Sequence, residues 1–208
     1  GTCLVGSEMC IRDRNERMFR GILEEGGSGM SELEIASIAE KVSRIDGFGG
    51  RIRMRRWPMD CDRAVVVSGR SGGVPSFFDS AVGGSGSSPT SPLGAGHRKI
   101  RDGEPVLVDL VHVHRGYVSD CTRMFSSGAM SKEWAQRLED MAQISDLVVS
   151  KLGAGGSCSE AWHEGKSLSA ELGYDHHLMG MPPHQARFLG HSVGLELDES
   201  PVVAGGFD

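Results

Sequence analysis

The stretch VLVDLVHVHRGYVSDCTRMF, residues 106–125, constrains the fold more than any other part of the chain. It contains two runs with the apolar and β-branched composition of strands, separated by a short turn at Arg115 and Gly116. We therefore expect a β-hairpin, with strands at 104–110 and 117–125.

Each of these strands carries an aspartate, Asp109 and Asp120, where the chain otherwise buries apolar surface. Side chains in a strand alternate with period two, so the odd separation lets both aspartates point to one face of the hairpin. Two bare carboxylates there would repel each other and lose hydration, which forces one to take up a proton. A divalent cation between them removes both problems. The alternative is an aspartate at a strand end in contact with water, and the spacing alone does not decide between them.

A third candidate ligand is His191, in the stretch FLGHSVGLELDESP. Its flanking glycines, Gly190 and Gly194, allow a ligand or another backbone to approach closely. A lone histidine in a strand is more often a core residue than a ligand, and the carboxylate pair elsewhere is what favours the ligand interpretation. Two aspartates and one histidine form an oxygen-dominated set, which suits manganese, cobalt, iron or zinc rather than copper or a thiolate site.

Composition excludes several classes of protein. The 208 residues suit one domain of moderate size or part of a larger one. No apolar run is long enough for a spanning helix, and a net charge of −6 does not favour a broad nucleic-acid surface, so neither membrane nor nucleic acid is expected as a partner. Five cysteines without a CxxC pair argue against a disulfide scaffold and for a reducing, cytoplasmic setting. A catalytic cysteine stays possible, but we interpret Cys121 as a packed thiol.

The remaining segments predict an α+β domain, in which helices back a curved antiparallel sheet. Ser31 and Glu34 form a capping-box pattern. The long loop rich in Gly, Ser and Pro is either a functional lid or oligomer contact, or a disordered insert. The predicted elements are helices at 15–25, 31–45, from Ser131 onward and at 157–172, strands at 51–56 and 64–68, the loop at 69–96, and a strand-like stretch at 187–201.

The first fourteen residues, GTCLVGSEMCIRDR, fit poorly with the rest of the chain. They lack the charged and then apolar regions of a signal peptide. Because they resemble translated adapter sequence, we expect residues 1–14 not to be native and residues 15–208 to form part of a catalytic domain.

The motifs together resemble the pita-bread metallopeptidase family, which includes methionine aminopeptidase, Xaa-Pro aminopeptidase, prolidase and creatinase. The resemblance rests on VLVDLVHVHRGYVSDCTRMF and GHSVGLELDESP, which match an aspartate in a strand, a Gly-aromatic turn, D-x-[ST]-[RK]-x-F and G-H-x-[IV]-G in order. GMSELEIASIAE is similar to the family's helix entry, and the resemblance covers about residues 15–208.

This resemblance implies a centre with two divalent metal ions (Mn, Co, Zn or Fe). Asp109 would bind one ion, Asp120 would bridge both, and His191 would bind the other. The family completes its site with two later glutamates, and this sequence ends before either position, so we expect a C-terminally incomplete domain that is itself inactive. The resemblance also implies a homodimer.

Two positions depart from the family pattern. Ser76, in GGVPSFFDS, stands where the family has a substrate-handling histidine, and Asp198, in LDESP, stands where it has another. We treat both as candidate substrate-binding residues and assign no residue a catalytic role with certainty. His184 matches no family position. The other histidines, expected to be exposed or to lie behind the ligands, are His112, His114, His176 and His177.

The resemblance implies a metal-dependent aminopeptidase or dipeptidase, of the Xaa-Pro peptidase kind, that acts on a peptide. One alternative is a creatinase-like C–N hydrolase or a metal-dependent lyase on a small organic substrate, which the two departures favour. The other is a pita-bread protein that binds a partner without catalysis.

Overall fold

The computed structural model describes residues 4–55, 61, 63–76, 80–153 and 155–206, and for residues 4–10 it describes the backbone alone. The chain divides into two compact units. The first unit is made of Gly1–Gly72, Gly84–Ala129 and Val193–Glu199, and the second of Gly73–Gly83, Met130–Ser192 and Ser200–Asp208.

The first unit is built on an antiparallel sheet of strand order β1-β2-β3, with β1 at Ala64–Ser68, β2 at Val106–His114 and β3 at Tyr117–Phe125. The expected hairpin is confirmed, and its first strand is longer than predicted. The turn explains the extra length. Arg115 and Gly116 both have positive φ (53° and 90°), which suits a two-residue hairpin turn and keeps the ladder paired up to His114 and Tyr117.

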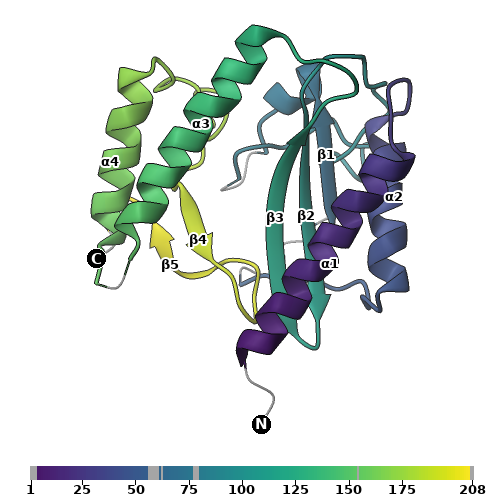
Figure 1. Ribbon diagram of the computed structural model, residues 1–208, viewed down its shortest axis with the longest axis horizontal. Helices are drawn as coiled ribbons and strands as arrows, with labels where there is room; N and C mark the ends of the chain where they lie inside the picture. Colours follow the sequence, from purple (N-terminus) through teal and green to yellow (C-terminus); the bar gives the residue numbers. More distant parts are fainter. Residues whose placement is uncertain (1–3, 56–60, 62, 77–79, 154, 207–208) are drawn as a thin grey trace. The chain divides into compact units, whose positions relative to one another are not determined.

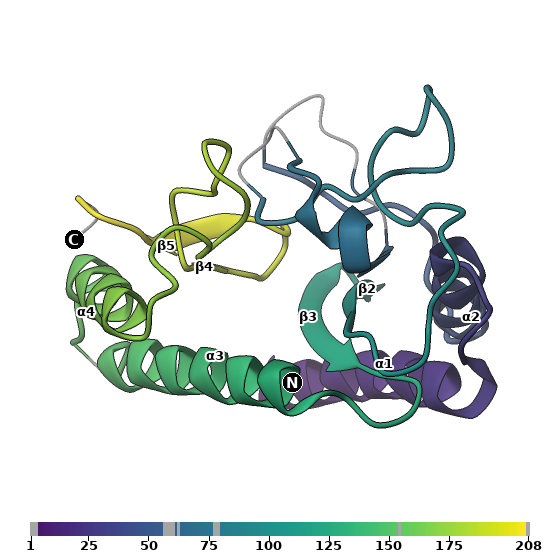
Figure 2. The same ribbon diagram turned by 90° about the horizontal axis from the view of Figure 1, so that it is seen from above.

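Two helices cover one face of this sheet. Helix α1 (Leu4–Glu25) contacts β2 and β3, and helix α2 (Glu32–Ile45) lies along β1 (Figures 1 and 2). The face toward the helices carries Val66, Val108 and Leu110, none of which has any exposed surface. Burying these side chains against the helices supplies the main hydrophobic stabilisation of the unit.

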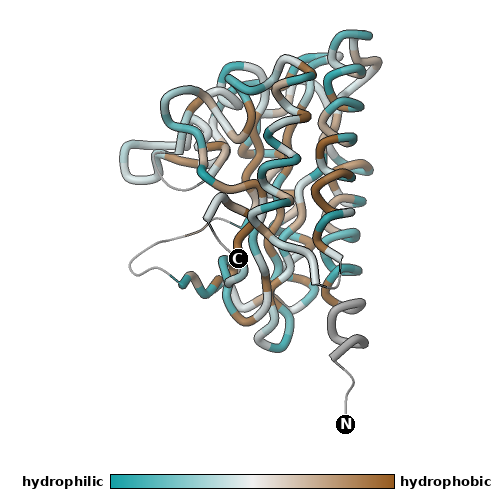
Figure 3. Tube along the Cα trace, turned by 90° about the vertical axis from the view of Figure 1, so that its left-hand side faces the viewer, coloured by the Kyte–Doolittle hydropathy of each residue, from teal (hydrophilic) through white to brown (hydrophobic). Residues whose placement is uncertain are grey.

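Helix α1 begins at Leu4, which corrects the predicted start at Asn15. Ile11 is buried together with Met18 and Ile22, so one apolar face continues through the segment that looked foreign in sequence. Figure 3 shows the resulting alternation of hydrophobic and hydrophilic residues along α1. Leu23, the residue after Ile22, is 69% exposed. That residues 1–14 are not native stays a prediction.

The capping box at the start of α2 is confirmed. The Ser31 hydroxyl accepts a hydrogen bond from the Glu34 amide (3.2 Å), and the Glu34 carboxylate accepts one from the Ser31 amide (2.6 Å). These bonds satisfy amides that the first helical turn leaves unpaired. No helix in the described residues is both long enough and apolar enough to cross a membrane.

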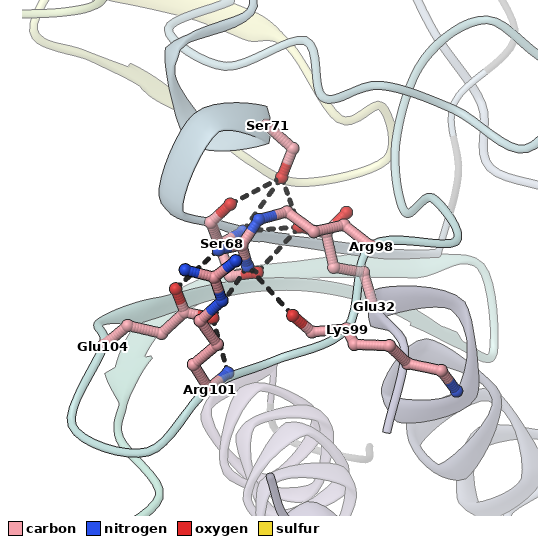
Figure 4. Close-up of polar contacts among 7 residues, drawn as sticks. All are labelled: Glu32, Ser68, Ser71, Arg98, Lys99, Arg101 and Glu104. Carbon is pink, nitrogen blue, oxygen red and sulfur yellow. Dashed lines mark hydrogen bonds and ion pairs between the residues drawn. The ribbon is translucent and has the colours of Figure 1, made fainter. Parts of the chain in front are cut away.

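A buried polar network joins α2 to the end of β1 (Figure 4). The Glu32 side chain has no exposed surface, and its carboxylate accepts from the Ser68 amide (2.7 Å), the Ser68 hydroxyl (2.8 Å), the Ser71 hydroxyl and the Gly96 amide (3.1 Å). Arg98 donates to the same Ser68 hydroxyl (2.5 Å) and forms a two-pronged ion pair with Glu104 (2.7 Å for each bond). The network holds the α2 start, the β1 end and the loop before β2 together.

The predicted strand at 51–56 is wrong for its described part, since residues 51–55 form no strand. Their polar groups bond to a loop instead. The Leu197 amide donates to the Arg53 carbonyl (2.9 Å), and the Arg55 amide donates to the Asp198 carboxylate (2.8 Å). The alternating pattern reflects Ile52 and Met54 packing on Val111 and Val118, which needs an extended chain and no ladder.

The predicted loop at 69–96 is confirmed over residues 69–76 and 80–96, apart from a short 3₁₀ helix, η1 (Gly69–Gly73), and residues 77–79 lie outside the described part of the chain. A glycine is required at one crossing point of this loop. A Cβ on Gly84, which has φ +79°, would lie 2.2 Å from the Gly94 carbonyl oxygen. The loop therefore owes this close backbone approach to glycine.

The second unit contains two helices, α3 (Lys132–Lys151) and α4 (Cys158–Glu171), which lie side by side (Figures 1 and 2). Both begin at the predicted caps, Ser131 and Ser157. A small sheet pairs β4 (Gly190–Ser192) with β5 (Glu199–Val203). The hydrophobic core of the second unit contains Val148, Ala161 and Val203.

Replacing Gly165 with valine should destabilise this unit by about 1–3 kcal/mol, because overpacking a filled core strains side chains and backbone. A Cβ at Gly165 would lie 2.6 Å from Val148 Cγ2 and 2.7 Å from Leu189 Cδ1. Chemical denaturation measures the change. Ser167→Val introduces the same side chain at an exposed position of the same helix and controls for helix propensity. Equal losses in the two variants would contradict close packing at Gly165.

Candidate metal centre

The hairpin register decides how the two aspartates lie. Asp109 pairs with Thr122 across the ladder, and Val111 pairs with Asp120. Residues opposite each other share a face, as do residues two apart, so Asp109 and Asp120 lie diagonally on the same face. This is the face turned away from α1 and α2. The predicted geometry of the pair is confirmed.

The two carboxyl groups interact strongly. Burial raises the pKa of Asp120 to about 8, helped by the negative charge of Asp109 and by a side-chain hydrogen bond between them. Asp120 thus holds a proton that an aspartate at a wet strand end would have lost. The observation favours the paired interpretation over the water-exposed one.

Thr122 orients the other member of the pair, because its hydroxyl donates to Asp109 Oδ1 at 2.6 Å. The pair fits a divalent cation on chemical grounds. Two adjacent carboxylates supply the hard oxygen donors such ions prefer, and the shared proton occupies the place where positive charge is needed. Among the described residues of the first unit, no third His, Cys, Asp or Glu side chain joins the two aspartates in a group that could hold a metal ion.

His191 belongs to the second unit, on β4, where its side chain is half-buried. Its Nδ1 lies 3.2 Å from the Ser192 carbonyl oxygen, and its ring meets the Phe188 ring edge to face at 5.8 Å. At Gly194 the expected close approach of another backbone is confirmed, since the Val118 amide donates to the Gly194 carbonyl (2.7 Å). A Cβ there would lie 2.7 Å from the Glu199 carboxylate, which accepts from the Leu195 amide (2.7 Å) and closes the turn after β4.

The two candidate substrate-binding residues take part in local structure. Ser76, in the second unit, is buried, and its hydroxyl donates to the Ser80 carbonyl (2.9 Å). Asp198, in the first unit, accepts from the Arg55 amide. Their role toward substrate stays a prediction.

His112 was expected to be exposed or to lie behind the ligands, and it is instead fully buried on the helix-covered face. Its Nδ1 lies 3.0 Å from the Ser43 hydroxyl, and its ring contacts Phe48. Burial lowers its pKa to about 4. The signal was present in the sequence, since His112 continues the even-numbered positions of Val108 and Leu110. His114 is half-buried, and His176, His177 and His184 are exposed.

Cys121 packs against the core of the first unit, and burial raises the pKa of its thiol. Both observations favour a packed thiol over a nucleophile.

Known proteins resemble this chain over most of its length. A Xaa-Pro dipeptidase from Lactobacillus delbrueckii subsp. lactis is 25% identical over 153 residues, which cover 71% of this chain and 40% of that protein. The crystal structure of X-Pro aminopeptidase from Thermotoga maritima MSB8 matches with a TM-score of 0.71 and 22% identity, over 92% of this chain and 46% of that one. The prolidase from Pyrococcus horikoshii OT3 matches with a TM-score of 0.70 and 20% identity, over 95% and 48%.

The structural matches show the fold, which is the predicted pita-bread fold. This chain spans less than half the length of each of the three proteins described. The model of metallopeptidase family M24 matches residues 11–208. Because that match extends over nearly the whole sequence, the chain belongs to metallopeptidase family M24.

Proposed function

We propose that the protein is a metal-dependent peptidase that releases the N-terminal residue of a peptide, with proline following that residue in the preferred substrate. The single observation that carries the proposal is the carboxylate pair of Asp109 and Asp120, held on one sheet face with a shared proton. Family membership supports peptide hydrolysis, and the names of the relatives support the choice of proline.

In this proposal Asp109, Asp120 and His191 would hold two divalent ions, and Asp120 would serve as a ligand to both. When bound, the ions supply Lewis acidity that activates a water molecule and polarises the scissile carbonyl. Asp120 gives up its proton to become a ligand. Thr122 keeps Asp109 Oδ1 oriented through its 2.6 Å hydrogen bond, which limits the carboxylate motion that would loosen an ion.

The proposed activity should require metal and should be greatest on short peptides whose second residue is proline. Incubation with a chelator should remove activity, and Mn²⁺, Co²⁺ or Zn²⁺ should restore it. Release of the N-terminal residue from Ala-Pro, measured against Ala-Ala and Pro-Ala, tests both expectations in the purified full-length protein. Hydrolysis that survives complete metal removal would contradict the proposal.

A second candidate function is a creatinase-like C–N hydrolase on the same scaffold. It is favoured by Ser76 and Asp198, whose polar groups bond to nearby backbone and stand where the family pattern has histidines. Adding small guanidino and amide compounds to the substrate panel separates the two. Turnover of these compounds without turnover of peptides would favour the second function. The homodimer and the cytoplasmic location stay predictions, and sedimentation of the purified protein would test the first.

A further inference from the structure

A pocket of about 230 Å³ lies wholly within the second unit, between α4 and the segment 178–189. Trp162 and Lys166 line it from α4, and Met179, Arg187 and Phe188 line it from the segment. No residue of the aspartate pair takes part, and the inference drawn from this pocket does not rest on the proposed function.

Two cationic residues, Lys166 and Arg187, line this pocket. Among the described residues, neither Lys166 nor Arg187 forms an ion pair, whereas Arg137 pairs with Glu133, and Lys151 lies near Glu160 and Glu164. The two residues line the same pocket from separate elements, Lys166 from α4 and Arg187 from the segment 178–189. An anion there would gain from both, and an Arg guanidinium can bind an oxyanion through two parallel hydrogen bonds.

Two aromatic rings, those of Trp162 and Phe188, also line the pocket, together with aliphatic side chains such as Leu178 and Leu189. Trp162 and Lys166 are four residues apart on α4, so ring and cation lie on one helix face. Phe188, directly after Arg187, repeats the combination on the other side. The pocket therefore combines apolar side chains, which can contact a flat ligand, with cations, which can bind a charged group of the same ligand. This is the usual composition of a small-molecule site.

The segment that closes the pocket is held in shape before any ligand binds. The Ala186 amide donates to the Met179 carbonyl (2.9 Å), and Gln185 Nε2 donates to the Leu178 carbonyl (3.1 Å). Met179 has φ +61°, a left-handed conformation that is unfavourable for a non-glycine residue and persists because the surroundings hold it. A preformed wall lowers the ordering cost of binding.

We infer that this pocket binds a small oxyanion carried on an apolar or aromatic body, either a carboxylate or a phosphate. Its volume limits the ligand to roughly ten non-hydrogen atoms, since a cavity of about 150 Å³ can hold benzene. The edge-to-face contact of Phe188 with His191 (5.8 Å) places the bound molecule one ring away from a predicted metal ligand.

Calorimetric titration of the purified protein with benzoate, phenyl phosphate and benzamide tests the inference. Benzoate or phenyl phosphate should bind saturably, at least about tenfold more tightly than neutral benzamide, and less tightly as salt is raised. The tighter of the two identifies the oxyanion. In NMR spectra the largest shifts should fall on the Trp162 indole. Equal affinity for benzamide, or no saturable binding of either anion, would overturn the inference.

Charge-removing variants locate the site. Arg187→Gln and Lys166→Gln should each weaken anion binding, and the double variant should abolish it within the measurable range. Both substitutions keep a long polar side chain, and matched melting curves show that the fold is intact. Lys132→Gln removes an exposed cation at the start of α3 and should leave affinity unchanged. Equal weakening in the Lys132 variant would place the anion elsewhere and reject this pocket.

Discussion

Replacing Asp120 with asparagine is expected to lower metal-dependent peptide release by roughly a thousandfold or more, which corresponds to about 4 kcal/mol of transition-state stabilisation. The amide keeps the size of the side chain but cannot bridge two cations as a charged ligand. Metal content after dialysis should fall in parallel with activity. Full activity in the variant would reject Asp120 as a ligand and, with it, the proposed centre.

The same substitution should leave the metal-free fold intact and, at pH 8, more stable than the native protein. The pKa of Asp120 is about 8 in the fold, against an ordinary value of 3.8. A carboxyl group whose pKa is raised by folding binds its proton more tightly in the folded state. Its contribution is therefore most favourable below about pH 4 and is lost as the pH rises toward 8. Asparagine has no such proton to lose.

Denaturation in the presence of a chelator at pH 5 and pH 8 measures this effect. The difference in the free energy of unfolding between the variant and the native protein should grow by a few kcal/mol from pH 5 to pH 8. The reason is that the unfolded state has already lost the Asp120 proton over this range, whereas the folded native protein still holds it. Asp146→Asn, at an exposed position of α3, removes a carboxylate without changing activity or this pH dependence. A variant that loses activity and unfolds at both pH values would indicate a structural role for Asp120.

Replacing Glu32 with alanine is expected to destabilise the first unit by about 3–5 kcal/mol, the range seen when one partner of a buried charged network is removed. The Glu32 carboxylate accepts hydrogen bonds from Ser68 and Ser71 (Figure 4) and from the Gly96 amide. The substitution removes the acceptor of the Ser68 hydroxyl and the Gly96 amide, whereas the Ser68 amide and the Ser71 hydroxyl keep their bonds to each other's residue. The substitution also affects Arg98, because the Ser68 hydroxyl to which Arg98 donates would no longer be oriented by Glu32.

Two further variants separate the network from a general effect of charge removal. Glu32→Gln keeps the shape but turns an amide NH₂ toward one set of donors, so its loss should be smaller, about 1–3 kcal/mol. Glu24→Ala, on the exposed side of α1, should change stability by no more than about 0.5 kcal/mol. A Glu32 variant as stable as the Glu24 variant would show that the donors find water or other partners.

Local chemistry made much of the fold predictable. Ser31, Ser131 and Ser157 cap helices where their side chains can accept from the third following amide, which depends only on neighbouring residues. The Arg115 turn and the alternating strands around it likewise follow from local preference. The prediction failed at residues 51–55, where alternation reflected packing on a neighbouring hairpin rather than membership of a ladder.

The candidate centre was predictable in part for the same reason. Asp109 and Asp120 belong to one hairpin, so the odd spacing and a short turn were enough to place both on one face. Gly194 shows the limit of such reasoning. In sequence it allows either a ligand or another backbone to approach closely, and only the fold shows that the Val118 backbone and the Glu199 carboxylate are the groups that do so.

By itself the sequence determined the features that depend on a few adjacent residues: the starts of α2, α3 and α4, the hairpin and the shared face of its two aspartates. Only the tertiary structure decided how completely each side chain is covered and which of the two aspartates holds the proton, because both depend on what distant segments bring to a position. His112 is neutral in the core because helix residues cover it, and Asp120 keeps its proton because desolvation and Asp109 act on it together. The Glu32 carboxylate can be fully buried because segments more than thirty residues away along the chain supply its hydrogen-bond donors.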